Sequence, residues 1–457
     1  MELAASRPAQ AFPPARTAWY AVGMMALVNA LDNIDRGIIS LLIEPIKRDL
    51  LLSDTEMSLL IGLAFSLFYG LVGLPMSRFA DTRNRKYILS FSILVWSTAT
   101  ACAAFASGFR SLFAVRALTG AAVSLKGPNA LSMISDLVPR HKYPTAMSIF
   151  NFGIVLGSAL SLIIGGTLVG LFAGRTFELP LGIVLRDWQM IFLLVGAPGV
   201  LVALLVMLTV PEPARRGRET TAKPPVLDVF RYLWRERSIY APFYIGAALL
   251  QIEAIGLLNW RVPFYSRTFG WGPEVIGPLM GTISILLTPI GLALGAWAGE
   301  RLAARGDPGA MIKLSILGAA LNLPLAIAGL LMPTPWLALG FSAAAVLVAG
   351  IGAPGAVAAL QTVTPNEFRG QLTALHLFTI AVIGGGLGPL VVALFTDYLF
   401  QDEAQLRYAM VTCAALFGGA GLALKFVSLP PYSRRVARIL AEEEEASYAA
   451  SPPVPGR

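Results

Sequence analysis

Long apolar runs alternate with short polar breaks along the whole chain. A run of about 20 apolar residues is long enough for a helix to cross a hydrocarbon layer of roughly 30 Å. Backbone groups in lipid must be hydrogen-bonded within the segment, and the short alternating segments of a membrane barrel are not seen, so the pattern predicts spanning helices. The predicted spans lie near residues 17–45, 56–80, 87–107, 110–137, 143–172, 188–210, 239–266, 272–302, 311–332, 335–361, 367–397 and 406–428.

A polar stretch from Pro211 to Lys223 divides these spans into two sets of six. The sequence therefore predicts an all-α membrane protein with 12 transmembrane helices in two pseudo-symmetric six-helix halves. The predicted segments are a disordered N-terminus at 1–16, the first half at 17–211, a cytoplasmic linker at 212–238, the second half at 239–430 and a partly disordered cytoplasmic tail at 431–457.

Apolar residues of the linker after Pro225 are interleaved with Arg231, Arg235 and Arg237. This pattern predicts an amphipathic helix on the inner membrane surface, which either tethers the halves or regulates them.

Basic residues gather in alternate loops, which by the positive-inside rule are cytoplasmic. The clusters are Arg83, Arg85 and Lys86; Arg140 and Lys142; Arg215, Arg216, Arg218 and Lys223; Arg301 and Arg305; Arg434, Arg435 and Arg438. We therefore expect a multi-pass protein of the plasma (inner) membrane with both termini in the cytoplasm. The net charge of +8 follows this topology, so no nucleic-acid partner is expected.

The amino-acid composition excludes several further classes of protein. With 56% hydrophobic and 14% charged residues, and a mean hydropathy of +0.68, the chain is more apolar than soluble domains are. Cys102 and Cys413 both fall in apolar spans and suggest neither a disulfide nor a metal site. No catalytic set, metal-ligand cluster or phosphate-binding loop stands out, so we expect no enzyme, no cofactor and no metal.

A conformational gate is predicted between the second and third spans, in Asp81-Thr82-Arg83-Asn84-Arg85-Lys86. A carboxylate at a helix end facing basic groups can form a charge-assisted latch that breaks when two halves rock. The pair Glu300-Arg301 occupies the corresponding place in the second half. This repetition indicates two related halves with a substrate site near mid-membrane.

These motifs resemble the major facilitator superfamily, in which the loop after the second span carries this acidic and basic pattern. Arg116 followed by Gly120 matches the buried-arginine pattern of its fourth span. Leu31-Asp32-Asn33-Ile34-Asp35-Arg36 resembles a signature of Spinster-like carriers and, as a second choice, of anion:cation symporters. The resemblance implies the major facilitator fold and secondary transport. Val123 and Ser124 stand where Spinster-like proteins have a Glu-Ala pair, and a new cation, Lys126, follows.

Charges inside the predicted spans are the candidate site, because an unpaired charge in the bilayer is costly. Asp32 and Asp35 share a helix face, and two such carboxylates can bind and release a proton. We expect proton coupling at Asp35, Asp32 and Glu253, with Asp35 foremost. The alternative for Asp35 is a static pair with an arginine.

Arg36, Arg116 and Lys126 outnumber their nearby carboxylates, which suits an anionic ligand. Further candidates for substrate binding are Tyr69, Asn129, Asn151, Trp260, Gln361 and His376. Ordinary packing is the alternative for each of these polar side chains.

The resulting hypothesis is a monomeric, proton-coupled carrier that moves a small or amphipathic organic anion by alternating access. A Spinster-like exporter of lipids, lysolipids or drugs is the second hypothesis, and a non-transporting membrane sensor is the third. The expected partners are therefore a small-molecule or lipid-like substrate, protons and membrane lipids.

Overall fold

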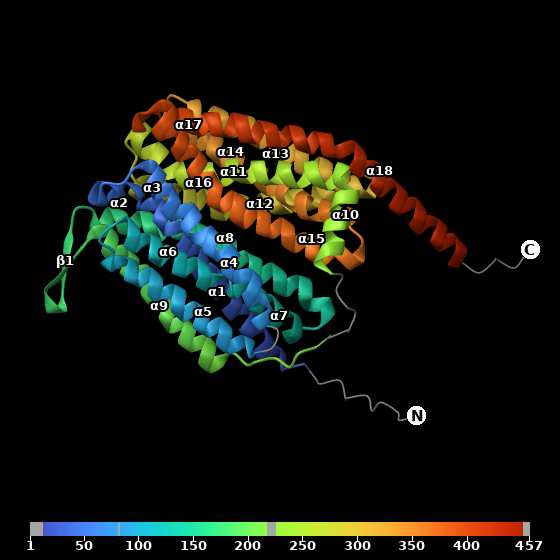
Figure 1. Ribbon diagram of the computed structural model, residues 1–457, viewed down its shortest axis with the longest axis horizontal. Helices are drawn as coiled ribbons and strands as arrows, with labels where there is room; N and C mark the ends of the chain where they lie inside the picture. The colour runs from blue at the N-terminus through green and yellow to red at the C-terminus, as the bar shows by residue number, and fades with distance from the viewer. Residues whose placement is uncertain (1–11, 81–82, 217–224, 451–457) are drawn as a thin grey trace, which may run out of the picture. The chain divides into compact units, whose positions relative to one another are not determined.

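The computed structural model describes residues 12–80, 83–216 and 225–450, and almost all of them are helical (Figure 1). Within these residues, ten helical stretches are long and apolar enough to cross a membrane. The predicted all-α membrane fold is confirmed. One short element differs: residues expected to form a loop make a hairpin of strands β1 (Thr176–Leu179) and β2 (Ile183–Arg186), in which Leu179 pairs with Ile183.

The helices of the first half follow the predicted spans. They are α1 (Ala15–Leu41), α2 (Ile43–Leu50), α3 (Asp54–Ser58), the π-helical turn η1 (Leu59–Leu63), α4 (Ala64–Ala80), α5 (Arg85–Cys102), α6 (Phe109–Val123), α7 (Lys126–Leu137), α8 (Tyr143–Phe172) and α9 (Asp187–Thr209).

Two predicted spans are not among the ten apolar stretches. The first is α1, which carries Asp32, Asp35 and Arg36 in its second half. The other is divided into α6 and α7, of 15 and 12 residues. Pro128 explains the break, since its ring has no N–H and clashes with the carbonyl of Ser124, four residues earlier. The count of twelve spans stays a prediction.

The second half contains both long and short helices. They are α10 (Val226–Arg235), α11 (Arg237–Phe269), α12 (Pro273–Ala304), α13 (Ala310–Leu331), α14 (Pro335–Val363), α15 (Asn366–Thr379), η5 (Ile380–Gly384), α16 (Gly385–Leu394), η6 (Phe395–Phe400), α17 (Leu406–Cys413), η8 (Ala414–Gly418) and α18 (Gly419–Ala450). The helix predicted in the linker is therefore present as α10. The tail, expected to be partly disordered, continues α18 as helix to Ala450.

The chain packs into two compact units. Of the described residues, unit 1 comprises 12–52, 64–80, 83–216 and 273–281, and unit 2 comprises 53–63, 225–272 and 282–450. Two segments therefore do not pack with the half that contains them in the sequence. Residues 53–63 belong to the predicted first half but pack in unit 2, and residues 273–281 belong to the predicted second half but pack in unit 1. Within unit 2, Arg267 donates to both oxygens of Asp54 at 2.6 and 2.8 Å, and Asp397 accepts from Thr55.

Each unit has its own apolar core. In unit 1 it forms around Met25, Trp96 and Met133, and in unit 2 around Tyr240, Ile312 and Tyr432. Small residues bring helices close together in unit 1: a Cβ added at Gly153 would lie 2.3 Å from the carbonyl oxygen of Ala26. Gly153 and Gly157 of the fifth predicted span therefore serve close packing of α8 against α1, whereas Gly166 lies against Pro273 of α12.

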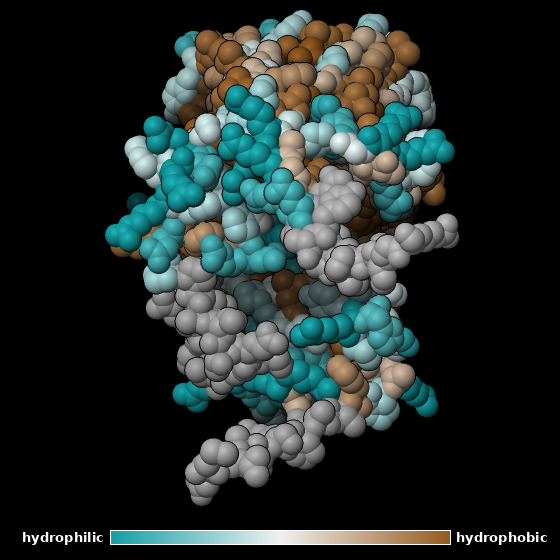
Figure 2. Space-filling model, turned by 90° about the vertical axis from the view of Figure 1, so that its right-hand side faces the viewer, coloured by the Kyte–Doolittle hydropathy of each residue, from teal (hydrophilic) through white to brown (hydrophobic). Residues whose placement is uncertain are grey.

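Figure 2 shows many hydrophilic side chains on the face that it draws, with apolar surface beside them. The helix α10 carries three exposed apolar side chains, Leu227, Phe230 and Trp234. Exposed apolar residues beside arginines are the features expected of a helix at a membrane surface.

Candidate functional site

A charged cluster lies inside unit 1, where α1, α6 and α7 contribute ionisable side chains. We define it as Asp32, Asp35, Arg36, Arg116 and Lys126. Both carboxylates are buried, with exposed fractions of 1% for Asp32 and 3% for Asp35. The structure therefore brings together the five charged residues predicted from the first and fourth spans.

Lys126 is the first residue of α7, directly after the break between α6 and α7. Its Nζ donates to Oδ2 of Asp32 at 2.5 Å and to Oδ1 of Asn29 at 2.7 Å. Nη1 of Arg36 lies 3.8 Å from the same Asp32 oxygen. The other oxygen, Oδ1 of Asp32, is buried and has no hydrogen-bond partner among the described residues.

Asp35 has a different environment from Asp32. Trp96 and Thr100 lie beside its carboxylate, and Arg116 interacts with it electrostatically. The ring of Phe65 links the two arginines, since Cζ of Arg36 lies 4.4 Å and Cζ of Arg116 lies 5.4 Å from its centroid. Both guanidinium groups thus have cation–π contacts with the same ring.

The cluster contains three cations and two carboxylates, so its formal charge is +1. Surplus charge in a region of low dielectric attracts an anion strongly. Lys126, one of the three cations expected to outnumber nearby carboxylates, is held by Asp32 and Asn29. An anion that binds Lys126 must therefore compete with Asp32.

The remaining polar candidates in unit 1 have different environments. Tyr69 is half-buried and stacks on Phe65 beside the cluster, with ring centroids 6.0 Å apart. Asn129 is buried, and its amide donates to the carbonyl of Leu125. Asn151 is exposed on α8. Of these three residues, the structure associates Tyr69 directly with the aromatic ring of the cluster.

The candidates in unit 2 are also scattered. Trp260 is buried and donates to the carbonyl of Pro389 at 2.9 Å. His376 is buried between the rings of Phe243 and Tyr244, an arrangement typical of packing. Gln361 is exposed at the end of α14.

The predicted gate is described only in part, because Asp81 lies outside the described residues. Arg85 is buried in unit 1, where its Nη1 lies 2.5 Å from Asp136 and its Nε 2.8 Å from Glu212. The backbone N–H of Lys86 also donates to Glu212. Arg85 therefore joins α5 to α7 and to the segment after α9.

Replacing Arg85 by glutamine is expected to destabilise the protein by about 3–5 kcal/mol, because Asp136 then stays buried without its charged partner. Thermal unfolding in detergent measures the effect. Arg140→Gln, at an exposed position, is the matched control. Equal unfolding temperatures for the two variants would contradict the structural role of Arg85.

The second gate pair is not an ion pair in the structure. Glu300 and Arg301 are both exposed near the end of α12. The guanidinium of Arg301 lies over the ring of Trp297, with Cζ 4.6 Å from its centroid. A gating role for Glu300 and Arg301 stays a prediction.

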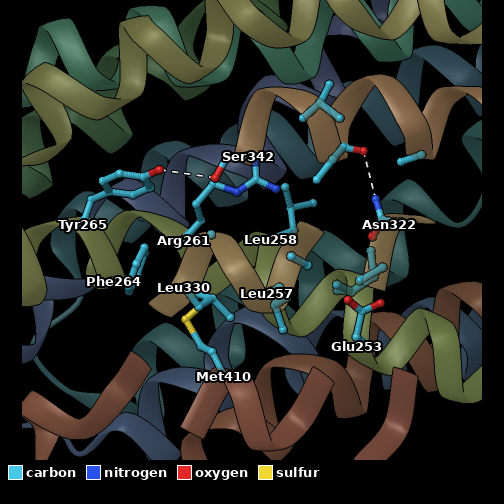
Figure 3. A pocket seen from close by; sticks show the side chains of 17 residues that line it. Glu253, Leu257, Leu258, Arg261, Phe264, Tyr265, Asn322, Leu330, Ser342 and Met410 are labelled. Carbon is cyan, nitrogen blue, oxygen red and sulfur yellow. Dashed lines mark hydrogen bonds between the residues drawn. The ribbon is translucent and has the colours of Figure 1, made fainter. Parts of the chain in front are cut away.

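A cavity of about 240 Å³ lies within unit 2, between α11, α13, α14 and α17 (Figure 3). Glu253, predicted as a proton-binding residue, lines it and is 6% exposed. Gly418 makes room for this side chain, since a Cβ at that position would lie 3.3 Å from Cγ of Glu253. Among the described residues, Glu253 has neither an ion pair nor a hydrogen bond.

Two cations inside predicted spans of unit 2, half-buried Arg261 and buried Lys425, were not among the sequence-predicted candidates. Arg261 lines the same cavity as Glu253, and Lys425 is buried where its Nζ donates to Oγ of Ser315. The sequence could have identified both residues, because they are ionisable and fall inside predicted spans. Across residues 12–80, 83–216 and 225–450, no group of His, Cys, Asp and Glu is arranged to hold a metal ion.

Comparison with known proteins places these features in context. The family profile described as Major Facilitator Superfamily matches residues 25–389. An MFS-type efflux pump of Mycolicibacterium smegmatis is 29% identical over 409 residues, which cover 88% of this chain and 90% of the pump. A sphingosine-1-phosphate transporter of Xenopus tropicalis is 24% identical over 442 residues, covering 90% of this chain and 82% of that protein.

The fold also matches solved structures. A bacterial homolog of the human lysosomal transporter Spinster, in an inward-facing and unoccupied conformation, superposes with a TM-score of 0.77 at 23% identity. The match covers 94% of this chain and 99% of that one. A D-xylose-proton symporter superposes with a TM-score of 0.65 at 16% identity, covering 91% of this chain and 99% of the symporter.

Proposed function

Because the chain belongs to the Major Facilitator Superfamily, we propose that it is a proton-coupled secondary transporter of a small or amphipathic organic anion. The named relatives are an efflux pump and a sphingosine-1-phosphate transporter, and a bacterial Spinster homolog has the same fold. In the proposed cycle, a monomer in the inner membrane, with both termini cytoplasmic, exposes its substrate site to the two sides alternately.

The proposal is based on one carboxylate oxygen of Asp32, Oδ2, which lies near both Lys126 and Arg36. Oδ2 of Asp32 is held by Lys126 and lies within reach of Arg36, while Oδ1 lacks a hydrogen-bond partner among the described residues. An anionic substrate that binds both cations displaces the Asp32 carboxylate from them. A buried carboxylate without its cations favours the protonated state. Anion binding and proton binding are thereby linked.

Asp35 provides the second proton site of the proposal. It is buried beside Trp96, and Arg116 is the cation that acts on it. Approach of Arg116 favours the carboxylate, and its withdrawal favours the acid. A conformational change that moves α6 relative to α1 would therefore load or release a proton.

A second candidate is export of a lipid or drug, which the efflux-pump and sphingosine-1-phosphate relatives favour. An anionic headgroup would meet the same cations as a carboxylate, so the charge of the cluster fits both candidates.

Purified protein in proteoliposomes distinguishes these candidates. We expect an inward proton gradient to drive movement of a labelled aromatic acid, with no movement of a labelled lysolipid. Movement of the lysolipid alone would replace the first candidate by the second. Movement of neither across a panel of both classes would contradict transport and favour a membrane sensor.

A further inference from the structure

The cavity of unit 2 is separate from the charged cluster and is made by four helices. Its lining is mostly apolar, from α11, α13, α14 and α17, with Leu257, Leu258 and Met410 among the side chains that line it (Figure 3). A volume of about 240 Å³ is many times the ~10–15 Å³ that a single water molecule needs. The space suits a compact organic molecule with an apolar body.

Polar groups stand at two ends of this space. Figure 3 shows Arg261, Tyr265 and Ser342 near one another, and Glu253 and Asn322 away from them. The hydroxyl groups of Tyr265 and Ser342 are 3.3 Å apart. Arg261 and Glu253 are eight residues apart on α11, which corresponds to about 12 Å along the helix axis.

Neither charged side chain of the cavity is paired within the described residues. Arg261 has no carboxylate partner there, and Glu253, buried to more than nine-tenths, lines the cavity without a hydrogen bond. A guanidinium beside two hydroxyl groups can bind a carboxylate through charge-assisted hydrogen bonds. The arrangement at Arg261 is therefore suited to a carboxylate ligand.

The charges of Arg261 and Glu253 link the two ends of the cavity, because a negative charge added at one end can be compensated by a proton at the other. The empty cavity contains one guanidinium and one carboxylate, which cancel. A bound organic carboxylate adds one negative charge, and a proton taken up by Glu253 restores neutrality, which the apolar surroundings favour. The bound state then contains the ligand carboxylate on Arg261 and the neutral acid form of Glu253.

Few other titratable groups face Glu253. Cys413 on α17 interacts with it, whereas Lys425 on α18 and His376 on α15 interact with each other. The helices α14 and α16 and the turn η8 contain no titratable residue, and Lys313 of α13 pairs with Asp307. Glu253 is thus the carboxylate that can respond to a ligand in this cavity.

We propose that the cavity of unit 2 is a second substrate site, which binds a monocarboxylate with a compact apolar body on Arg261 and takes up a proton on Glu253. This inference rests on the proposed function, because it assigns a substrate class to the same carrier. It differs in placing a proton-coupled carboxylate site outside the charged cluster of unit 1.

The test measures binding of labelled 3-phenylpropionate to full-length protein that carries Lys126→Met and Asp32→Asn, which removes the lysine of the unit 1 site and keeps the charge balanced. We expect this variant to bind the acid, to reject 3-phenylpropanamide and to take up about one proton for each acid bound. Adding Arg261→Gln should weaken acid binding about tenfold or more, since the guanidinium is lost. Adding Glu253→Gln should preserve binding and abolish proton uptake.

Matched controls separate binding from folding. Arg237→Gln on the same helix and the exposed Glu442→Gln should leave both readouts unchanged. If Arg261→Gln lowers the unfolding temperature, Arg261→Lys provides the second variant, and it should weaken acid binding while preserving proton uptake.

The outcomes also separate this inference from the proposed function. Loss of all acid binding in the Lys126→Met and Asp32→Asn background, or full binding after Arg261→Gln, would overturn the second site and leave the proposed function standing. Binding that depends on Arg261, without any proton-driven accumulation in proteoliposomes, would support the second site and contradict the proposed function.

Discussion

Replacing Asp35 by asparagine is expected to abolish proton-driven accumulation of the substrate. The substitution preserves the size of a side chain that is 3% exposed and lies beside Trp96 and Thr100, so the fold should be retained. An amide cannot bind and release a proton in the accessible pH range. Exchange of labelled for unlabelled substrate, which needs no net proton movement, should persist in part.

The measurement is uptake into proteoliposomes over a range of pH, with and without a proton gradient. Asp35→Glu retains a carboxylate and should recover part of the accumulation. Asp228→Asn, on the linker helix α10, is a control of the same chemistry outside the cluster. An unchanged pH dependence in Asp35→Asn would eliminate Asp35 as the coupling site and return it to a static pair with Arg116.

Replacing Lys126 by methionine is expected to weaken transport of an anionic substrate about 100-fold, as the loss of a strong charge-assisted hydrogen bond implies. A neutral analogue of similar size should be affected much less. The comparison of KM for the two substrates is the measurement. Equal losses for both substrates would assign Lys126 a structural role.

The pairing of Lys126 with Asp32 calls for a second variant. Methionine alone leaves Asp32 buried near Arg36, at 3.8 Å, without its ammonium partner. Lys126→Met combined with Asp32→Asn removes both charges and should recover thermal stability. Recovery of stability without recovery of anion transport by the unit 1 site would assign the ammonium group to the substrate.

The fold could be predicted because apolar length is a strong signal. Runs such as 143–172 and 188–210 correspond to α8 and α9 within a few residues. The break in the fourth span was missed, although Pro128 marks it: the lost hydrogen bond to Ser124 is a local property. Helix continuation past residue 430 was missed because a charged tail resembles a disordered one.

The sequence could identify the residues of the candidate site but not the contacts between them. The cost of charge in lipid identifies Asp32 and Lys126, but the two are 94 residues apart, so their contact depends on packing of α7 against α1. The partners of Arg85 were missed for the same reason, because Asp136 and Glu212 are distant in sequence. Arg261 was missed although its position in a span marked it as a candidate.

The unbroken helix α18 offers a means of following motion. It runs for 32 residues from Gly419 to Ala450, so its last 20 residues extend about 30 Å at 1.5 Å per residue. A tilt of the helix by about 10° would displace its far end by about 5 Å, as on a lever arm of that length. A spin label at position 442, introduced after the exposed Cys102 is replaced, lies about 17 Å along this arm and would move by about 3 Å, so it would report rotations of unit 2.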